Sequence, residues 1–272
     1  MFINYLIGRR VGFFEVFRMA KHLFSKDFKN YAKVLGFIFL PINFLLAVVD
    51  MFTMDVMSGF DLSVILQSPE NLTAFMSSAE YALINRYNFI IMVIELFFVP
   101  LATIAVSLLV YNFCYGKTAV PFKDIFIDTL SKGSTLIFAT IIYIVLLSAG
   151  LMLFVLPGIF LVIFTSFYVQ CIALKNDGPF RCIKSSFKMV GKKWFGLAVK
   201  LIGFYFINVL ITYGVTILLG FMATNLFTTA IVTTLASVGQ IIYAICVALV
   251  FLNIETGGYA IKSVEIKDEF EQ

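Results

Sequence analysis

Six long runs of apolar residues alternate with shorter polar segments along the chain. Each run is long enough, or nearly so, to cross a hydrocarbon core of about 30 Å as a helix, which takes about 17–25 residues. The pattern therefore predicts an all-α fold, a polytopic membrane protein with six transmembrane helices. The predicted helices cover residues 34–54, 88–111, 134–156, 157–174, 195–221 and 228–253.

The connections between these runs are unequal. Leu156-Pro157-Gly158 predicts a tight, uncharged turn between the third and fourth helices, and a few residues around Asn225 join the fifth and sixth. The connection at residues 55–87 is longer, and it carries four acidic residues and one arginine. We expect short helical stretches there, on either side of a turn.

Amphipathic stretches precede the first, third and fifth apolar runs. In the last of these, apolar residues recur at helical spacing from Phe180 to Val190, and basic residues occupy another face. Segments of this kind lie in the headgroup plane with their cations on phosphate. We therefore expect cytoplasmic-side interfacial amphipathic helices, in a unit of interfacial helix, span, outer turn and span that occurs three times.

Charge sets the expected orientation. All but two of the 20 Lys and Arg residues lie in the N-terminal segment, the C-terminal tail or the loops after the second and fourth runs, and the exceptions are Arg86 and Lys200. Because cytoplasmic loops carry an excess of Lys and Arg, we expect both termini in the cytoplasm of a bacterium, with the protein in the cytoplasmic (plasma) membrane. Residues 1–272 then form a single integral membrane domain, with an interfacial segment at 1–33 and a short cytoplasmic tail at 254–272.

Composition excludes a soluble protein. Hydrophobic residues make up 61% of the chain and charged residues 13%, against about 45–50% and 25% in soluble domains, and the mean hydropathy is +0.99. The basic residues border hydrophobic spans, so the expected partners are anionic phospholipids and not nucleic acid. The cations expected to bind headgroups are Arg18, Lys21, Lys123, Arg181, Lys184, Lys188, Lys192, Lys193 and Lys200.

One stretch resembles a recurring bacterial pattern. It starts with Pro157-Gly158-Ile159-Phe160, continues through a span that ends near Ala173-Leu174, and finishes with Gly178-Pro179-Phe180 and the run from Lys184 to Phe195. This stretch resembles YciC-like membrane proteins and the membrane domain attached to some glycerophosphodiester phosphodiesterases. The resemblance implies a six-helix integral membrane fold in the cell envelope. It implies no hydrolase activity, because the fused catalytic domain and its His-Arg-Gly start have no counterpart in this sequence.

Catalytic and metal chemistry find little support in the sequence. His22 is the only histidine, and it has no cysteine or carboxylate at metal-ligand spacing. The four cysteines are scattered and form no CxxC motif, which favours packing roles. No phosphate-binding loop or nucleophile elbow occurs. We therefore expect no enzyme activity, no catalytic residue, no metal and no cofactor.

Polar residues inside the apolar runs are more informative, because each must find a partner there. An intramembrane polar cluster is expected from Asn43, Glu95, Asn208 and Gln240. The cluster is interpreted as helix–helix contacts or as a polar path that uses Glu95 as a protonatable group. A Glu95–Lys200 pair is not expected, because the predicted depths of the two residues in the membrane differ by about 16 Å. Lys200 is expected to reach the cytoplasmic headgroups.

Two functions remain in competition. The first is a non-enzymatic membrane protein with a basic, lipid-facing collar, acting as a membrane-organising, assembly or envelope-homeostasis component. The alternative is a small transporter or channel with a path past the four residues of the polar cluster. A membrane-protein partner or a second copy of the chain stays open as a further partner.

Overall fold

The computed structural model describes residues 2–65, 67–117, 120–223 and 225–257. In these ranges the chain is helical and contains no β-strand. Six helical stretches are long and apolar enough to cross a membrane, which confirms the expected all-α, multi-pass membrane fold. They are Phe28–Ser58, Ala79–Cys114, Gly133–Leu153, Val155–Lys175, Pro179–Met222 and Leu226–Glu255.

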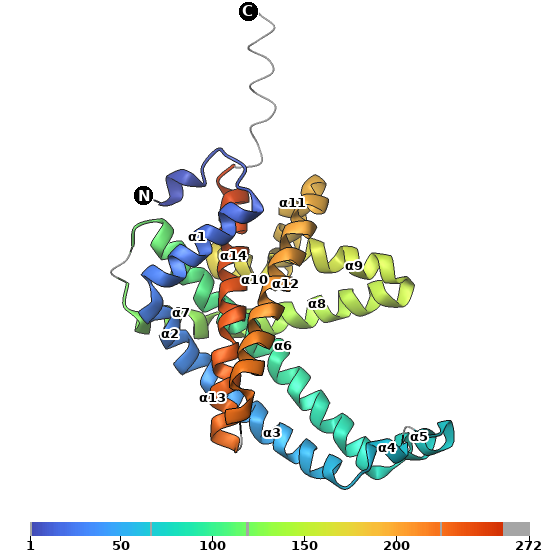
Figure 1. Ribbon diagram of the computed structural model, residues 1–272. Helices are drawn as coiled ribbons and strands as arrows, with labels where there is room; N and C mark the ends of the chain where they lie inside the picture. The colour runs from blue at the N-terminus through green and yellow to red at the C-terminus, as the bar shows by residue number, and fades with distance from the viewer. Residues whose placement is uncertain (1, 66, 118–119, 224, 258–272) are drawn as a thin grey trace, which may run out of the picture.

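Most of these stretches consist of more than one helix (Figure 1). Their helices are α2 Phe28–Val34, a π-helical turn Leu35–Phe39, α3 Leu40–Ser58, α6 Ala79–Cys114, α8 Gly133–Leu153, α9 Val155–Phe164, α10 Tyr168–Lys175, α11 Pro179–Val190, a 3-10 turn Gly191–Lys193, α12 Trp194–Leu219, a 3-10 turn Gly220–Met222, α13 Leu226–Ala236 and α14 Val238–Glu255. The remaining elements are a 3-10 turn Phe2–Tyr5, α1 Phe13–Lys26, α4 Leu62–Ile65, α5 Pro69–Met76 and α7 Phe122–Ser131.

The connection expected at residues 55–87 is mostly helical. α6 is 36 residues long and already begins at Ala79, inside that connection. α3 extends into it as far as Ser58, and α4 and α5 lie between α3 and α6. The Ser68 side chain caps α5 by accepting a hydrogen bond from the Asn71 backbone N–H at 3.1 Å. The short helices expected there are therefore present.

The turn between α8 and α9 lies at Phe154, slightly before the expected Leu156-Pro157-Gly158. Phe154 is extended, and Pro157 lies in the first turn of α9, where a missing backbone N–H breaks no helical hydrogen bond. The two helices approach closely, because a Cβ on Gly150 would lie 3.3 Å from the Gly158 Cα. In Figure 1 this hairpin runs across the view, at a wide angle to α12 and α14.

α14 lies at the centre of the bundle and packs against α1, α6 and α12. In the stretch Leu226–Glu255, 72% of the most apolar window is buried, compared with 11% in Pro179–Met222. The two ends of the described chain meet beside α14, where the Gly8 backbone N–H donates to the Thr256 carbonyl at 3.3 Å. We call this part of the bundle the termini end.

In two of the six stretches, turn residues that are not helical separate one helix from the next. α9 ends at Phe164 and α10 begins at Tyr168, while Ser237 separates α13 from α14. The buried hydroxyl of Ser186 on α11 bridges the first break. It accepts from the Phe167 N–H at 3.1 Å and donates to the Phe164 carbonyl at 2.7 Å. The backbone groups freed by the break are thus partly satisfied from a neighbouring helix.

Helices form at all three segments expected at the membrane interface, namely α1, α7 and α11. Their buried side chains face protein, however. α1 packs against α14, and α11 packs against α8 and α10. Ile183 and Val190 of α11 are buried, whereas Phe180 is 78% exposed. Protein therefore covers much of the apolar stripe that the sequence suggested for lipid, and an interfacial position stays a prediction.

Candidate functional site

The cations expected to bind headgroups, here called the basic collar, come from four parts of the chain. Two lie on α1, one on α7 and three on α11, and the other three lie on the 3-10 turn Gly191–Lys193 and the first part of α12. α1 and α11 both lie at the termini end (Figure 1). Lys193 is half-buried and Lys200 is buried. The exposed members are Arg18, Lys21, Lys123, Arg181, Lys184, Lys188 and Lys192.

Exposed phenylalanines accompany the collar. Phe14 on α1 is 79% exposed, and Phe180 on α11 and Phe195 at the start of α12 are similarly open. A helix that rests on a membrane surface typically combines such aromatic residues with Lys and Arg. The arrangement is therefore suited to a surface with anionic headgroups above an apolar layer.

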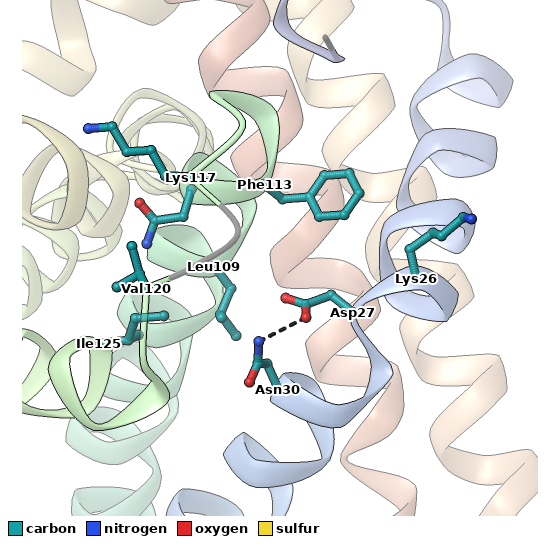
Figure 2. Close-up of a pocket in the computed structure, with 9 residues that line it drawn as sticks. Lys26, Asp27, Asn30, Leu109, Phe113, Lys117, Val120 and Ile125 are labelled. Atoms are coloured by element: carbon teal, nitrogen blue, oxygen red, sulfur yellow. Dashed lines mark hydrogen bonds between the residues drawn. The ribbon is translucent and has the colours of Figure 1, made fainter.

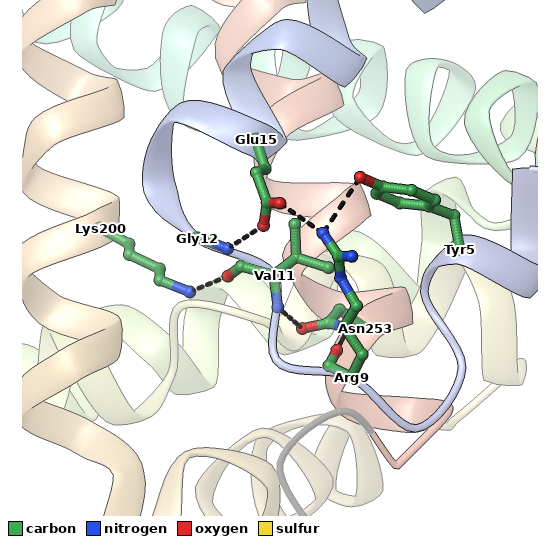
Figure 3. A network of polar contacts seen from close by, with 7 residues as sticks. All are labelled: Tyr5, Arg9, Val11, Gly12, Glu15, Lys200 and Asn253. Atoms are coloured by element: carbon green, nitrogen blue, oxygen red, sulfur yellow. Dashed lines mark hydrogen bonds and ion pairs between the residues drawn. The ribbon is translucent and has the colours of Figure 1, made fainter.

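Lys200 differs from the expected headgroup contact. It is 8% exposed, and its ammonium group donates to the Val11 carbonyl at 2.5 Å (Figure 3). Val11 precedes α1, so its carbonyl is available to a side chain. The N-terminal segment folds over the start of α12 and supplies an acceptor that the sequence did not reveal.

The same network ties the N-terminal segment to α14. Asn253 is 2% exposed; its amide nitrogen donates to the carbonyls of Leu6 and Arg9 at 2.9 and 2.8 Å, and its amide oxygen accepts from the Val11 N–H at 3.3 Å. Glu15 contacts Arg9 and accepts from the Gly12 N–H at the start of α1 (Figure 3). We call these contacts the N-terminal clamp.

A small pocket of about 160 Å³ lies between the α1–α2 junction and α6 and α7. Asp27 accepts a hydrogen bond from the Asn30 amide at 2.8 Å, whereas the ammonium groups of Lys26 and Lys117 point away from this pair (Figure 2). Burial raises the pKa of Asp27, and the Asn30 hydrogen bond and the charge of Lys33 partly oppose that rise. A carboxyl group thus lines the pocket, which makes the pocket poorly suited to phosphate.

Asn43 of the expected polar cluster lies in a helix–helix contact. It is 8% exposed, and its amide donates to the hydroxyls of Thr234 and Ser237 at 3.2 and 3.1 Å. These bonds join α3 to the junction of α13 and α14. For Asn43, the structure supports the interpretation as a packing contact.

Asn208 lies in a second helix–helix contact. A Cβ on Gly239 would lie 2.7 Å from the Asn208 side-chain oxygen, so the two helices approach closely at this glycine. Thr212, one turn further along α12, donates to the Ala236 carbonyl at 3.3 Å. Asn208 therefore joins α12 to the last stretch, at a site separate from Asn43.

Glu95 and Gln240, the other two expected members, line one shared pocket of about 490 Å³. We call it the intramembrane pocket, since residues of α6, α8, α10 and α14 surround it. Its polar residues that sequence reasoning missed are Thr103, Tyr143, Ser166, Tyr168, Gln170 and Tyr243. Gln170 could have indicated the pocket from the sequence, because it is a lone amide within the fourth apolar run.

Within the described residues, no group of three or more His, Cys, Asp or Glu could hold a metal ion. All four cysteines are free and buried, and His22 is exposed on α1. Comparison of the chain with family models, curated proteins and solved structures found no match. The resemblance to YciC-like proteins stays a prediction.

Proposed function

We propose that this protein is a non-enzymatic, multi-pass component of a bacterial plasma membrane that holds anionic phospholipids through its basic collar. In this proposal both termini are cytoplasmic, and the protein organises the membrane or supports assembly of the envelope. The carrying observation is that α1 and α11, which both lie at the termini end (Figure 1), carry exposed cations together with exposed phenylalanines.

The energetics favour lipid as the partner of the collar. A Lys or Arg near an anionic leaflet contributes about 1 kcal/mol, and the attraction decays within a Debye length of about 8–10 Å. Arg181 is 81% exposed even though it pairs with Asp177, so its guanidinium still reaches solvent. Several such cations acting together would give a clear preference for anionic over neutral lipid.

Lys184 and Lys188, together with Arg181, provide the test. We expect the triple change to Gln to reduce the thermal stabilisation that phosphatidylglycerol gives over phosphatidylcholine, measured on purified protein in nanodiscs of each lipid. The matched control is Arg86→Gln, which removes a cation that lies outside the collar. If the triple variant keeps the full selectivity for phosphatidylglycerol, or if Arg86→Gln loses as much, the collar proposal is wrong.

A small transporter is the second candidate, and the intramembrane pocket favours it. Of the four residues expected along the path, only Glu95 and Gln240 line the pocket, because Asn43 and Asn208 lie in helix–helix contacts. Discontinuous spans beside a polar pocket recur in secondary transporters. A carrier needs a ligand at such a site, and the ligand is a separate question from the collar.

A further inference from the structure

The intramembrane pocket contains polar groups that the fold leaves without partners. Buried side-chain oxygen atoms without a hydrogen bond occur at four described residues, and three of these residues, Ser166, Gln170 and Gln240, line this pocket. Gln170 is only 2% exposed. A buried polar group without a hydrogen bond destabilises the fold. Their concentration in one place therefore indicates space that something polar fills.

The backbone beside the pocket is also interrupted. Ser166 lies in the break between α9 and α10, where Ser186 satisfies two backbone groups from outside. On the opposite wall, Pro100 has no N–H to donate to the Leu96 carbonyl one turn earlier, and both residues line the pocket. Irregular backbone at membrane depth is tolerated where it lines a cavity. One wall therefore contains a helix break, and the other contains a proline that removes one hydrogen bond from the continuous helix α6.

The carboxylate sets the sign of the ligand. Each glutamine amide carries an accepting oxygen and a donating nitrogen, which exchange places by rotation, so the amides require polarity without fixing charge. Glu95 adds a carboxyl group, which is negative when ionised and never positive, and Asp50 on α3 is near enough to interact with it electrostatically. No Lys or Arg is among the described residues that line the pocket. An anion would therefore meet repulsion there, and a cation would meet attraction.

Aromatic rings and apolar side chains form the rest of the wall. The rings of Tyr143 and Tyr168 stack at 5.4 Å, and Tyr243 lines the pocket beside them. Tyrosine faces attract organic cations as well as apolar groups. About 490 Å³ is also much more than a bare inorganic ion needs, and it falls within the size range of small-molecule sites, about 300–1,000 Å³.

We infer that the intramembrane pocket binds a small organic cation, a protonated amine with an apolar body. The ammonium group pairs with Glu95 and donates hydrogen bonds to the side-chain oxygen of Gln170, Gln240 or Ser166. The apolar body rests against the tyrosines and Val247. This inference does not rest on the collar, since it concerns a different part of the molecule.

The test uses benzylammonium as the probe, with full-length protein in nanodiscs of neutral phosphatidylcholine, so that the amine does not accumulate on anionic lipid. Benzyl alcohol and benzoate match the probe in size and differ in charge. We expect saturable binding of benzylammonium by calorimetry, at least tenfold tighter than binding of either analogue. We expect Glu95→Gln to weaken it at least tenfold, and Asp55→Asn, a carboxylate change outside the pocket, to leave it unchanged.

Comparison of the three probes on the unaltered protein needs no variant, so it stands even if Glu95→Gln fails to fold. Equal binding of benzoate or benzyl alcohol would overturn the inference. So would binding of potassium ions with no binding of benzylammonium, or the absence of any saturable binding. Equal losses in Glu95→Gln and Asp55→Asn would show that Glu95 does not contact the probe.

Discussion

Asn43 and Gln240 are both amides in apolar spans, yet they differ in what the fold gives them. Asn43 donates to two hydroxyls, whereas the side-chain oxygen of Gln240 has no partner. An amide in a span is most simply a bond between helices. The bonded amide of Asn43 and the unpaired amide oxygen of Gln240 therefore separate a packing role from a candidate binding role, and a sequence alone cannot make that distinction.

Asp27 offers a test of burial at a single residue. Its raised pKa means that the folded state holds the proton more tightly than the unfolded chain does. Between the unfolded value, about 3.9, and the raised folded value, the free energy of unfolding therefore falls as the pH rises. Above that window the charged group disfavours the fold.

We expect Asp27→Asn to remove this part of the pH dependence. The amide still accepts from Asn30 and carries no charge, so the variant should be more stable at neutral pH, by less than about 1 kcal/mol because Asp27 is only partly buried. Thermal unfolding of both proteins in detergent between pH 4 and pH 8 measures the difference. A variant that is less stable at neutral pH, with the same dependence as the parent, would show that burial does not dominate at Asp27.

At the scale of elements, α11 has a role that its position in the sequence hides. Its basic face belongs to the collar, while Ser186 on its buried side holds the break between α9 and α10. The break itself contains no proline, so no residue type signals it. A helix expected to rest on lipid thus also shapes a wall of the intramembrane pocket.

Ser186→Ala tests this link. The change leaves the Phe167 N–H and the Phe164 carbonyl without the hydroxyl, and we expect a loss of about 1–3 kcal/mol in the free energy of unfolding. Ser185→Ala is the matched control, since its hydroxyl donates to Asp177 at 2.7 Å in a more open position. Denaturant unfolding in mixed micelles gives both values. Equal losses would mean that the Ser186 bridge across the break stabilises the fold no more than the hydrogen bond of Ser185 does.

At the scale of the whole molecule, the N-terminal clamp joins the two ends of the described chain. Asn253 alone makes three hydrogen bonds to backbone groups of the N-terminal segment. If these hydrogen bonds are removed, water can bond to the freed backbone groups only after the N-terminal segment moves away from the bundle. The clamp therefore decides whether the segment before α1 stays on the bundle.

We expect Asn253→Leu to release that segment while the spans stay folded. Limited trypsin digestion should then cut after Arg9 or Arg10 at least several times faster than in the parent protein. Asn225→Ala is the control, because it removes a side-chain oxygen that caps α13, which is not part of the clamp. If the cutting rate near Arg9 does not change in Asn253→Leu, other contacts hold the segment.

The sequence predicts the spans well and the contacts between them poorly, for one physical reason. In lipid a helix is apolar on all sides, so periodicity does not show which face meets protein. The run at 88–111 could therefore be recognised, but not that Glu95 faces the same pocket as Gln240 and Gln170. Lys200 was misplaced similarly, because its acceptor at Val11 is a backbone carbonyl brought in by tertiary folding.

The central position of α14 has a consequence for how the protein is made. α14 is the last helix of the described chain to be translated, although α1, α6 and α12 all pack against it. Chains fold from the N-terminus as they leave the ribosome. Until α14 enters the bilayer, α6 and α12 lack this shared partner, and the clamp lacks Asn253. The contacts of α6 with α3 and α10 do not need α14, so the half-made protein keeps these contacts while its termini end stays open. Insertion factors or membrane proteases have access to that end until α14 is in place.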